Sequence, residues 1–320
     1  MNIRPFDYSD RDYEIVRGIN DAVWPQDPLN MVNMRYYDGI RPKDRYFHRF
    51  IGEVDGVPVG SGAIHAAWWF DLPNYFQLDW STHPDHERRG YGSAFYDFAL
   101  AQLKVDGKTP ETIEISARED KPQSVAWIEK RGFTLNNRYP RSELKLAEFD
   151  MSQFASYKAR AVENGFVIKP LSEIIPTDPD WQHKVYELEW IFEQDEPNPQ
   201  PPTKVPFEQY VKDTLGNPGF TPATWFMALD GDRYAGMSCL WPDKVKPHSL
   251  QTGWTGVDRP YRKQGLAMAM KLHAIEYAIS QPQITVIETD NHEKNWMFQI
   301  NLRLGFRPIP AWLQYLKTLA

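Results

Sequence analysis

Two short stretches of the chain place basic side chains and small residues where a helix is expected to begin. Residues 262–267 read RKQGLA, and residues 87–92 read ERRGYG. The first amides of a helix have no partner within the helix and carry partial positive charge, so they form a natural site for phosphate. Gly265 and Gly90 lack a Cβ that would keep an anion away from the main chain. The number of donors in each loop favours a diphosphate.

The residues expected to hold this anion combine bare main chain with mobile positive charge. Around the first glycine they are Arg88, Arg89, Gly90, Tyr91, Gly92 and Ser93, and around the second they are Arg262, Lys263, Gln264, Gly265, Leu266 and Ala267. The alternative is that these basic residues decorate an exposed helix start. The motifs GxxxxGK[ST] and GxGxxG are absent from the sequence. Recurrence of the pattern between a strand and a helix favours the anion site.

Both stretches belong to a duplicated sequence. Four landmarks occur twice in the same order. They are IRPF or IKPL, an Asp-Gly hairpin pattern, the basic glycine loop and a Gly-Phe pair. The spacing from Gly56 to Gly90 is 34 residues, as is the spacing from Gly231 to Gly265. We therefore expect two copies of one domain, 1–148 and 167–320, joined by a linker helix within 149–166.

The elements that would position each loop follow one order in both copies. A strand and a helix (11–23 or 181–194) precede the hairpin, and a strand at 75–82 or 250–257 leads into the loop. The helix after the loop, a strand at 112–117 or 284–289, a last helix and a final strand complete the copy. This order predicts an α/β fold with a mixed sheet and a right-handed crossover around each loop. A proline-rich insertion at 196–206 should be extended.

Composition excludes several other classes of protein. The net charge of −7 disfavours a general nucleic-acid binder, and the single cysteine, Cys239, excludes an intrachain disulfide and a cysteine-rich metal site. HPDH at 83–86 reads as a capped loop more readily than as a metal site. The N-terminal residues are charged and no apolar run could cross a bilayer, so we expect a cytoplasmic protein that uses no metal and no membrane.

At this point the pattern resembles the GNAT N-acetyltransferase superfamily, whose acetyl-CoA loop reads [Arg/Gln]-x-x-Gly-x-[Gly/Ala]. RKQGLA is similar at every defined position, whereas ERRGYG has Glu87 in place of Arg or Gln. The segment TDNHEKNWMFQINLRLGF at 289–306 resembles the later part of the family pattern. The resemblance spans nearly the whole chain and implies two tandem copies of the GNAT fold.

The resemblance implies that the loop amides hold the diphosphate of coenzyme A. The strand ends at Thr82 and Val257 would lie along the pantetheine, and a neighbouring strand would splay away to admit the thioester. A backbone N–H there would polarise the thioester carbonyl. Asn291 and Asn295 are further candidates for cofactor contact, with helix capping as the alternative. The second copy, with the intact loop, is expected to be the catalyst.

Catalytic groups are harder to assign. Many members of the family use a Tyr four residues before the final glycine as the acid, and this chain has Ile128 and Asn301 at those positions. Neither can donate a proton as a phenol does, so the acid would be another group or water. Glu288 is the candidate base, with Asp290 and, in the first copy, Asp79 as further acids. Glu288 and Asn301 thus mark the expected catalytic positions of the second copy.

The acids near the proline-rich insertion suggest the acceptor. Asp195 and Glu196 could receive a cationic amine, or could belong to a solvated helix end. The expected activity is transfer of acetyl from acetyl-CoA to a primary amine of a small molecule by direct attack. The alternatives are a non-catalytic acyl-CoA-binding protein and an acetyltransferase acting on a protein or peptide amine. The sequence indicates neither the acceptor nor the oligomeric state.

Overall fold

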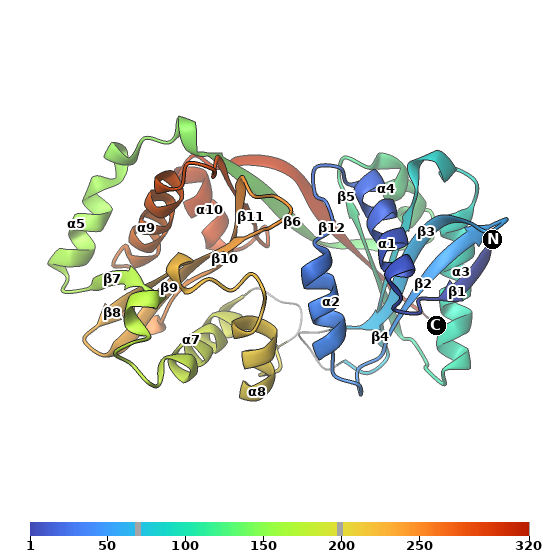
Figure 1. The fold of residues 1–320 in the computed structure, drawn as a ribbon, viewed down its shortest axis with the longest axis horizontal. Helices are drawn as coiled ribbons and strands as arrows, with labels where there is room; N and C mark the ends of the chain where they lie inside the picture. Colours follow the sequence, from blue (N-terminus) through green and yellow to red (C-terminus); the bar gives the residue numbers. More distant parts are fainter. Residues whose placement is uncertain (68–71, 197–200, 320) are drawn as a thin grey trace. The chain divides into compact units, whose positions relative to one another are not determined.

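The structure is a computed structural model that describes residues 1–67, 72–196 and 201–319. Contacts between residues divide it into two compact units: unit 1 contains Met1–Arg138 and Trp312–Ala320, and unit 2 contains Tyr139–Ala311. Each unit is a mixed sheet covered by helices, so the predicted α/β fold class is confirmed (Figure 1). Residues 197–200 of the predicted proline-rich insertion lie outside the described residues.

The sheet of unit 1 has the strand order β1-β2-β3-β4-β5-β12, antiparallel throughout except for the parallel pair β4–β5. Its strands are β1 (Asn2–Pro5), β2 (Phe47–Val54), β3 (Val57–Ala66), β4 (Tyr75–Thr82), β5 (Thr112–Arg118) and the end of β12 (Arg307–Thr318). Its helices are α1 (Asp10–Val23), α2 (Met31–Ile40), α3 (Tyr91–Val105) and α4 (Pro122–Glu129). α1 begins where it does because the side chain of Ser9 accepts a hydrogen bond from the amide of Asp12.

Unit 2 repeats this plan in the order β7-β8-β9-β10-β11-β6, with β10–β11 as the parallel pair. Its strands are β7 (Val167–Pro170), β8 (Trp225–Asp230), β9 (Arg233–Pro242), β10 (Ser249–Val257), β11 (Val286–Asp290) and the end of β6 (Thr134–Lys145). Its helices are α5 (Ala155–Glu163), α6 (Leu171–Ile174), α7 (Trp181–Asp195), α8 (Phe207–Tyr210), α9 (Leu266–Ser280) and α10 (Trp296–Arg303).

Both predicted hairpins form, with a difference in the second turn. In unit 1 the central residues are Asp55 and Gly56, with φ of 52° and 77°, as a type I′ turn requires. In unit 2 Asp230 pairs with Arg233, so the central residues are Gly231 and Asp232. The turn is therefore displaced by one position from the Asp-Gly pair that the sequence pattern suggested.

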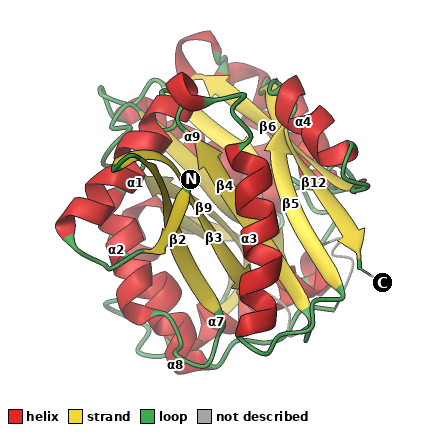
Figure 2. Ribbon diagram, turned by 90° about the vertical axis from the view of Figure 1, so that its right-hand side faces the viewer, coloured by secondary structure: helices red, strands yellow, loops and turns green. Residues whose placement is uncertain are grey.

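Opposite faces of each sheet are covered by different helices. In unit 1 Phe50 packs with the α3 residues Phe95 and Ala99, whereas its neighbour Ile51 packs with Tyr13 of α1. Successive strand residues point to opposite faces, so α1 and α3 cover opposite faces of the sheet, as can be followed in Figure 2. In unit 2 the corresponding helices are α7 and α9, which pack with successive residues of β8. The loop before α3 or α9 therefore joins the end of an interior strand, β4 or β10, to a helix that packs on the sheet.

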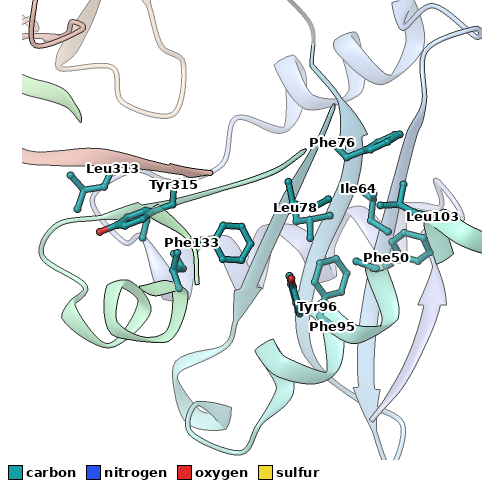
Figure 3. Close-up of a cluster of buried hydrophobic side chains, with 14 residues drawn as sticks. Phe50, Ile64, Phe76, Leu78, Phe95, Tyr96, Leu103, Phe133, Leu313 and Tyr315 are labelled. Atoms are coloured by element: carbon teal, nitrogen blue, oxygen red, sulfur yellow. The ribbon is translucent and has the colours of Figure 1, made fainter. Parts of the chain in front are cut away.

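The final strand of each sheet comes from the other sequence copy. Trp312–Thr318 of β12 pair with β5, and Figure 3 shows Leu313 and Tyr315 in the core of unit 1 near Phe133. Arg141–Lys145 of β6 pair with β11, and Leu144 lies in the core of unit 2 with Ile287. The compact units therefore cross the predicted repeats 1–148 and 167–320. These boundaries describe sequence repeats and stay a prediction, as does the linker 149–166, whose helix α5 packs on α9 within unit 2.

This exchange of strands predicts which unit a core substitution weakens. Tyr315→Ala removes a ring that is 2% exposed and should cost about 3–5 kcal/mol. Because Tyr315 pairs with Ile115 of β5, amide hydrogen–deuterium exchange should rise first in β5 and not in β11. Leu144→Ala is the matched change and should raise amide hydrogen–deuterium exchange first in β11. Fast exchange of β11 in Tyr315→Ala would contradict the strand exchange.

Candidate active site

The two basic glycine loops have the same backbone conformation. Gly90 and Gly265 both have φ of 84° and ψ of 4°, and two residues earlier Arg88 and Lys263 have φ of 62° and 65°. α3 and α9 begin at the next residue, and neither start has a side-chain cap. The first-turn amides therefore lack partners within their helices, and the turn brings them together with the loop main chain as an anion-binding concavity.

This local structure brings the predicted cofactor residues together in each unit. Tyr91, Gly92 and Ser93 form the first turn of α3, and Leu266 and Ala267 open α9. The basic side chains before each glycine are exposed, namely Arg88, Arg89, Arg262 and Lys263, while Gln264 is half-buried. Thr82 and Val257 end the strands that lead into the loops. Whether these residues contact a cofactor stays a prediction.

Asp195 anchors the loop of unit 2. Its carboxylate accepts hydrogen bonds from Arg262 and from Arg259, the latter at 3.0 Å. Desolvation opposes ionisation of Asp195, but these hydrogen bonds outweigh it and lower the pKa of the carboxyl below its ordinary value. Arg262 also donates from Nε to the carbonyl of Val257 at 2.9 Å. The sequence suggested Asp195 as a substrate contact, and the structure places it against two arginines.

In the described part of the chain the loop of unit 1 has no equivalent of this anchor, because Glu87 stands in place of Arg262. Two of its polar side chains, Ser93 and Thr82, form hydrogen bonds with other side chains of unit 1. Ser93 accepts hydrogen bonds from Arg131 at 2.6 Å and from Trp127 at 3.3 Å, and Arg131 lies 3.8 Å from the centre of the Trp127 ring. Thr82 accepts a hydrogen bond from Trp80 Nε1 at 2.8 Å. The two loops share a backbone and differ in side-chain chemistry.

The parallel strands part in front of each loop. Pairing of β4 with β5 ends at Gln77–Glu114, and β4 continues to Thr82. Pairing of β10 with β11 ends at Gln251–Glu288, and β10 continues to Val257. Each unit therefore has an opening between two parallel strands, as the family resemblance implied. The residues beyond the last pair retain a partner strand on one side only.

A β-bulge distinguishes the opening of unit 2. Thr252 pairs with Leu240 and Thr255 pairs with Ser238, so Gly253 and Trp254 face the single residue Cys239. Such a bulge leaves main-chain groups outside the ladder, and bulges are common beside active sites. The register of β3 with β4 in unit 1 runs without a shift from Gly60 to Ala66. Unit 2 alone of the two thus combines the intact loop sequence with an irregular strand at the opening, within the described residues.

Glycine is required at two positions of β10. A Cβ on Gly253 would overlap the indole of Trp241, and a Cβ on Gly256 would overlap the ring of Phe192. The second contact presses α7 onto the strand that ends at the loop. Sequence reasoning missed both contacts, although glycine inside a strand pattern is a signal for a bulge or a close approach.

Glu288, the predicted base, forms ion pairs with basic side chains. Its carboxylate accepts hydrogen bonds from Lys246 Nζ at 2.5 Å and Ser249 Oγ at 3.2 Å, and Arg141 lies 3.5 Å away. Asp290, two residues on, is exposed and accepts a hydrogen bond from Gln251 Nε2 at 3.0 Å. Desolvation by the surrounding protein raises the pKa of Asp290, and Arg141 offsets part of this effect. Asp290 is therefore the better placed of the two to exchange a proton.

Glu196 belongs to the same acidic region. Desolvation raises its pKa, the charge of Asp290 raises it further, and a hydrogen bond from Asn295 Nδ2 at 2.7 Å acts in the opposite sense. Asn295 also caps α10, because its Oδ1 accepts a hydrogen bond from the amide of Met297 at 2.9 Å. The capping role offered as the alternative for Asn295 is thus present in the structure.

The residues at the family's acid position are inside the protein. Asn301 is 0% exposed, and its Nδ2 donates to Asn291 Oδ1 at 2.8 Å. Ile128 of unit 1 is 2% exposed. Asn301 and Asn291 therefore fix the segment that follows β11. Neither side chain offers an ionisable proton to a leaving group.

Unit 2 also carries a separate open groove of about 400 Å³, lined among others by Lys184, Glu187, Tyr234 and Tyr261. It lies between α7, the β8–β9 turn and residues 258–261, and the residues of the strand opening do not line it. Its Lys184 donates to Asp178 at 2.8 Å, and Lys204 donates to Glu187 at 2.7 Å. The groove adjoins the turn before the loop and is distinct from the opening.

Two further classes of site were sought in the described part of the chain. Across residues 1–67, 72–196 and 201–319, no group of three or more His, Cys, Asp and Glu side chains could hold a metal ion. Over the same residues, no helix combines the length and the apolar character needed to span a bilayer.

Comparison with known proteins agrees with this geometry. Three solved structures resemble the chain: a tandem GNAT protein from the clavulanic acid biosynthesis pathway (18% identity, 99% of this chain, 98% of that chain, TM-score 0.74); a GCN5-related N-acetyltransferase from Sphaerobacter thermophilus (14%, 99%, 95%, 0.68); and the glucosamine N-acetyltransferase region of a fungal multi-domain enzyme (16%, 98%, 38%, 0.70). At these identities the likeness shows the fold. No curated protein sequence matches the chain.

The family itself is shown by the sequence. The model of the acetyltransferase (GNAT) family matches residues 12–133 and residues 183–298, one segment in each sequence copy and together most of the chain. The chain is therefore a tandem member of the GNAT acetyltransferase family.

Proposed function

We propose that the chain is an N-acetyltransferase that moves acetyl from acetyl-CoA to a primary amine of a small molecule, with unit 2 as the catalyst. The observation that carries this proposal is the coincidence in unit 2 of the anchored Arg262 loop, the parted strands and the β10 bulge. Family membership supports acyl transfer in general. The amine acceptor and the acetyl donor are our inference.

The cofactor site would be built mainly from main chain. The amides from Lys263 to Ala267 would hold the diphosphate, because Gly265 places no Cβ over them and the nearest atom to one would be Tyr157 Cδ1 at 3.6 Å. Arg262 would add a positive charge whose position Asp195 fixes. Acetyl-CoA supplies an activated acetyl group as a thioester. A main-chain N–H at the bulge, Gly253–Trp254, would polarise its carbonyl oxygen.

The acceptor would approach from the side of Asp290 and Glu196. Two carboxylates with raised pKa values and no arginine within ion-pair distance, among the described residues, would attract an ammonium ion and then take its proton. Glu288 is assigned to holding the end of β11 through Lys246 and Arg141. Because Asn301 is buried and cannot supply a proton, the leaving thiolate is proposed to take one from water.

Unit 1 is proposed to hold the same nucleotide without turnover. Its loop repeats the Gly265 conformation at Gly90, whereas its β4 strand has no register shift against β3. A second candidate function follows from Asn301 and Ile128: if neither unit protonates the thiolate, both would bind acyl-CoA and neither would transfer it. Release of free thiol from acetyl-CoA over a panel of amines, followed with a thiol dye, tests this point. Thiol release above the amine-free rate supports the enzyme, and its absence supports the binding protein.

Matched substitutions at the two loops should separate the units. Gly90→Ala and Gly265→Ala place a Cβ at φ of 84° in both cases, so each should lose about 1–2 kcal/mol of stability. Turnover should fall at least about tenfold more for Gly265→Ala than for Gly90→Ala, a difference of about 1.4 kcal/mol in the barrier. Steady-state kinetics and thermal melts measure both effects. Equal loss of turnover would overturn the assignment of catalysis to unit 2.

The pH dependence should identify the base. Because desolvation by the surrounding protein raises the pKa of Asp290, its carboxylate is available above that raised value and is lost as the pH falls through it. kcat/KM should therefore rise with pH along an acid limb in the unaltered protein. Asp290→Asn should remove this limb and lower kcat/KM by about 10²–10⁴-fold.

Glu288→Gln is the control for this experiment, since Glu288 stands opposite Gln251 at the last strand pair and is already held by Lys246. The acid limb should persist in Glu288→Gln. If Glu288→Gln removes the limb and Asp290→Asn keeps it, the proton goes to Glu288 and the assignment to Asp290 is wrong.

A further inference from the structure

One face of α7 carries a row of carboxylates. Glu189 and Glu193 lie four residues apart on one side of the helix, and Glu196, the residue that follows its last turn, comes three residues later. Phe192 belongs to the same side, and its ring is packed so closely on Gly256 that a Cβ there would overlap it. The row is therefore held over β10, next to the bulge and the strand opening.

The acids of this row lack cationic partners among the residues that the structure describes. Within the described residues, no Lys, Arg or His forms an ion pair with Glu189, Glu193 or Glu196. Acids on other sides of the same helix are paired: Asp195 with Arg259 and Arg262, and Glu187 with Lys204. Desolvation raises the pKa of both Glu193 and Glu196. The chain thus neutralises the outer acids of α7 and leaves this row unneutralised.

Glu189, the innermost of the three, gives an independent sign of a missing partner. It is 5% exposed, and its Oε1 has no hydrogen-bond partner within the described residues. Burial raises its pKa to about 8, the nearby Tyr210 hydroxyl acts in the opposite sense, and the neighbouring charge of Glu193 adds to the effect of burial. A buried carboxyl oxygen without a partner is costly, so such groups usually have a ligand or water to bond. The charge of Glu193 raises the pKa of Glu189, and the charge of Asp290 raises the pKa of Glu196.

We propose that the acceptor is a diamine or polyamine, with its reacting amine at Asp290 and Glu196 and a second ammonium held by Glu193 and Glu189. This inference rests on the proposed function of unit 2 and names the acceptor class. Along the axis of α7, the helical rise places Glu189 about 10 Å from Glu196 and Glu193 about 5 Å from Glu196. A flexible aliphatic chain between two amines spans such a distance, and its methylene groups would lie beside Trp254, which packs with Phe192.

The reaction balances with groups already present. The reacting ammonium gives a proton to Asp290 or Glu196, and its nitrogen forms the C–N bond with the acetyl carbon. The C–S bond breaks, the thiolate takes a proton from water, and the second N–H proton of the nitrogen leaves to solvent. The product amide is neutral at the reacting end and keeps one ammonium at Glu193. It thereby loses one of its two ionic contacts, which favours release over substrate.

The test compares amines of equal chain length. Thiol release is followed for hexamethylenediamine and hexylamine with the full chain. kcat/KM for hexamethylenediamine should exceed that for hexylamine by about tenfold or more, equivalent to about 1.4 kcal/mol, mainly through KM. Glu193→Gln should lower kcat/KM for the diamine about tenfold more than for hexylamine.

Glu187→Gln is the matched control, because Glu187 lies on α7 and is paired with Lys204 outside the row. It should leave the ratio between the two amines unchanged, and thermal melts of all variants show that they fold. Equal kcat/KM for hexylamine and hexamethylenediamine overturns this inference, as does an equal effect of Glu193→Gln on both. Absence of thiol release with every amine overturns the proposed function itself.

Discussion

The proposed cofactor site depends on a main-chain feature: unpartnered amides at a left-handed glycine before a helix. Gly265 and Gly90 reach the same φ and ψ, although the side chains around them differ. Glycine adopts this conformation without steric cost, and the first helical turn then presents donors that nothing inside the helix can satisfy. In unit 2 the ion pair with Asp195 fixes the position of the Arg262 side chain. An anion bound there would replace no internal hydrogen bond of the helix.

The two units show how duplicated folds can diverge at a site while keeping its frame. Both keep the parallel strand pair that ends at a Gln–Glu pair, Gln77–Glu114 or Gln251–Glu288. Unit 2 adds the bulge on β10 and the unneutralised acids of α7. Unit 1 instead has a regular β4 and the large ring of Trp80, above Gly52 and Gly60. The loop backbone is thus the same in both units, whereas the bulge and the unpaired acids occur in unit 2.

Much of the fold could be predicted from the sequence because its signals are local. Glycine loops, turn residues and alternating strands fix the backbone within a few residues, and the first helices and the strands before the loops were placed correctly. The exchange of final strands could not be predicted, because β6 and β12 have equivalent patterns and either would satisfy either sheet. The ion pairs of Asp195 with Arg262 and of Glu288 with Lys246 were also missed, because they join residues 67 and 42 positions apart. Buried Asn301 shows that a position taken from a family motif need not keep its role.

The central claim is that these main-chain donors bind the diphosphate of coenzyme A. Calorimetric titration with coenzyme A and, in parallel, with pantetheine tests it most directly, because pantetheine carries the thiol arm without the nucleotide diphosphate. The account predicts measurable binding of coenzyme A and much weaker binding of pantetheine. Equal affinity for the two compounds, or no heat with coenzyme A, would contradict it.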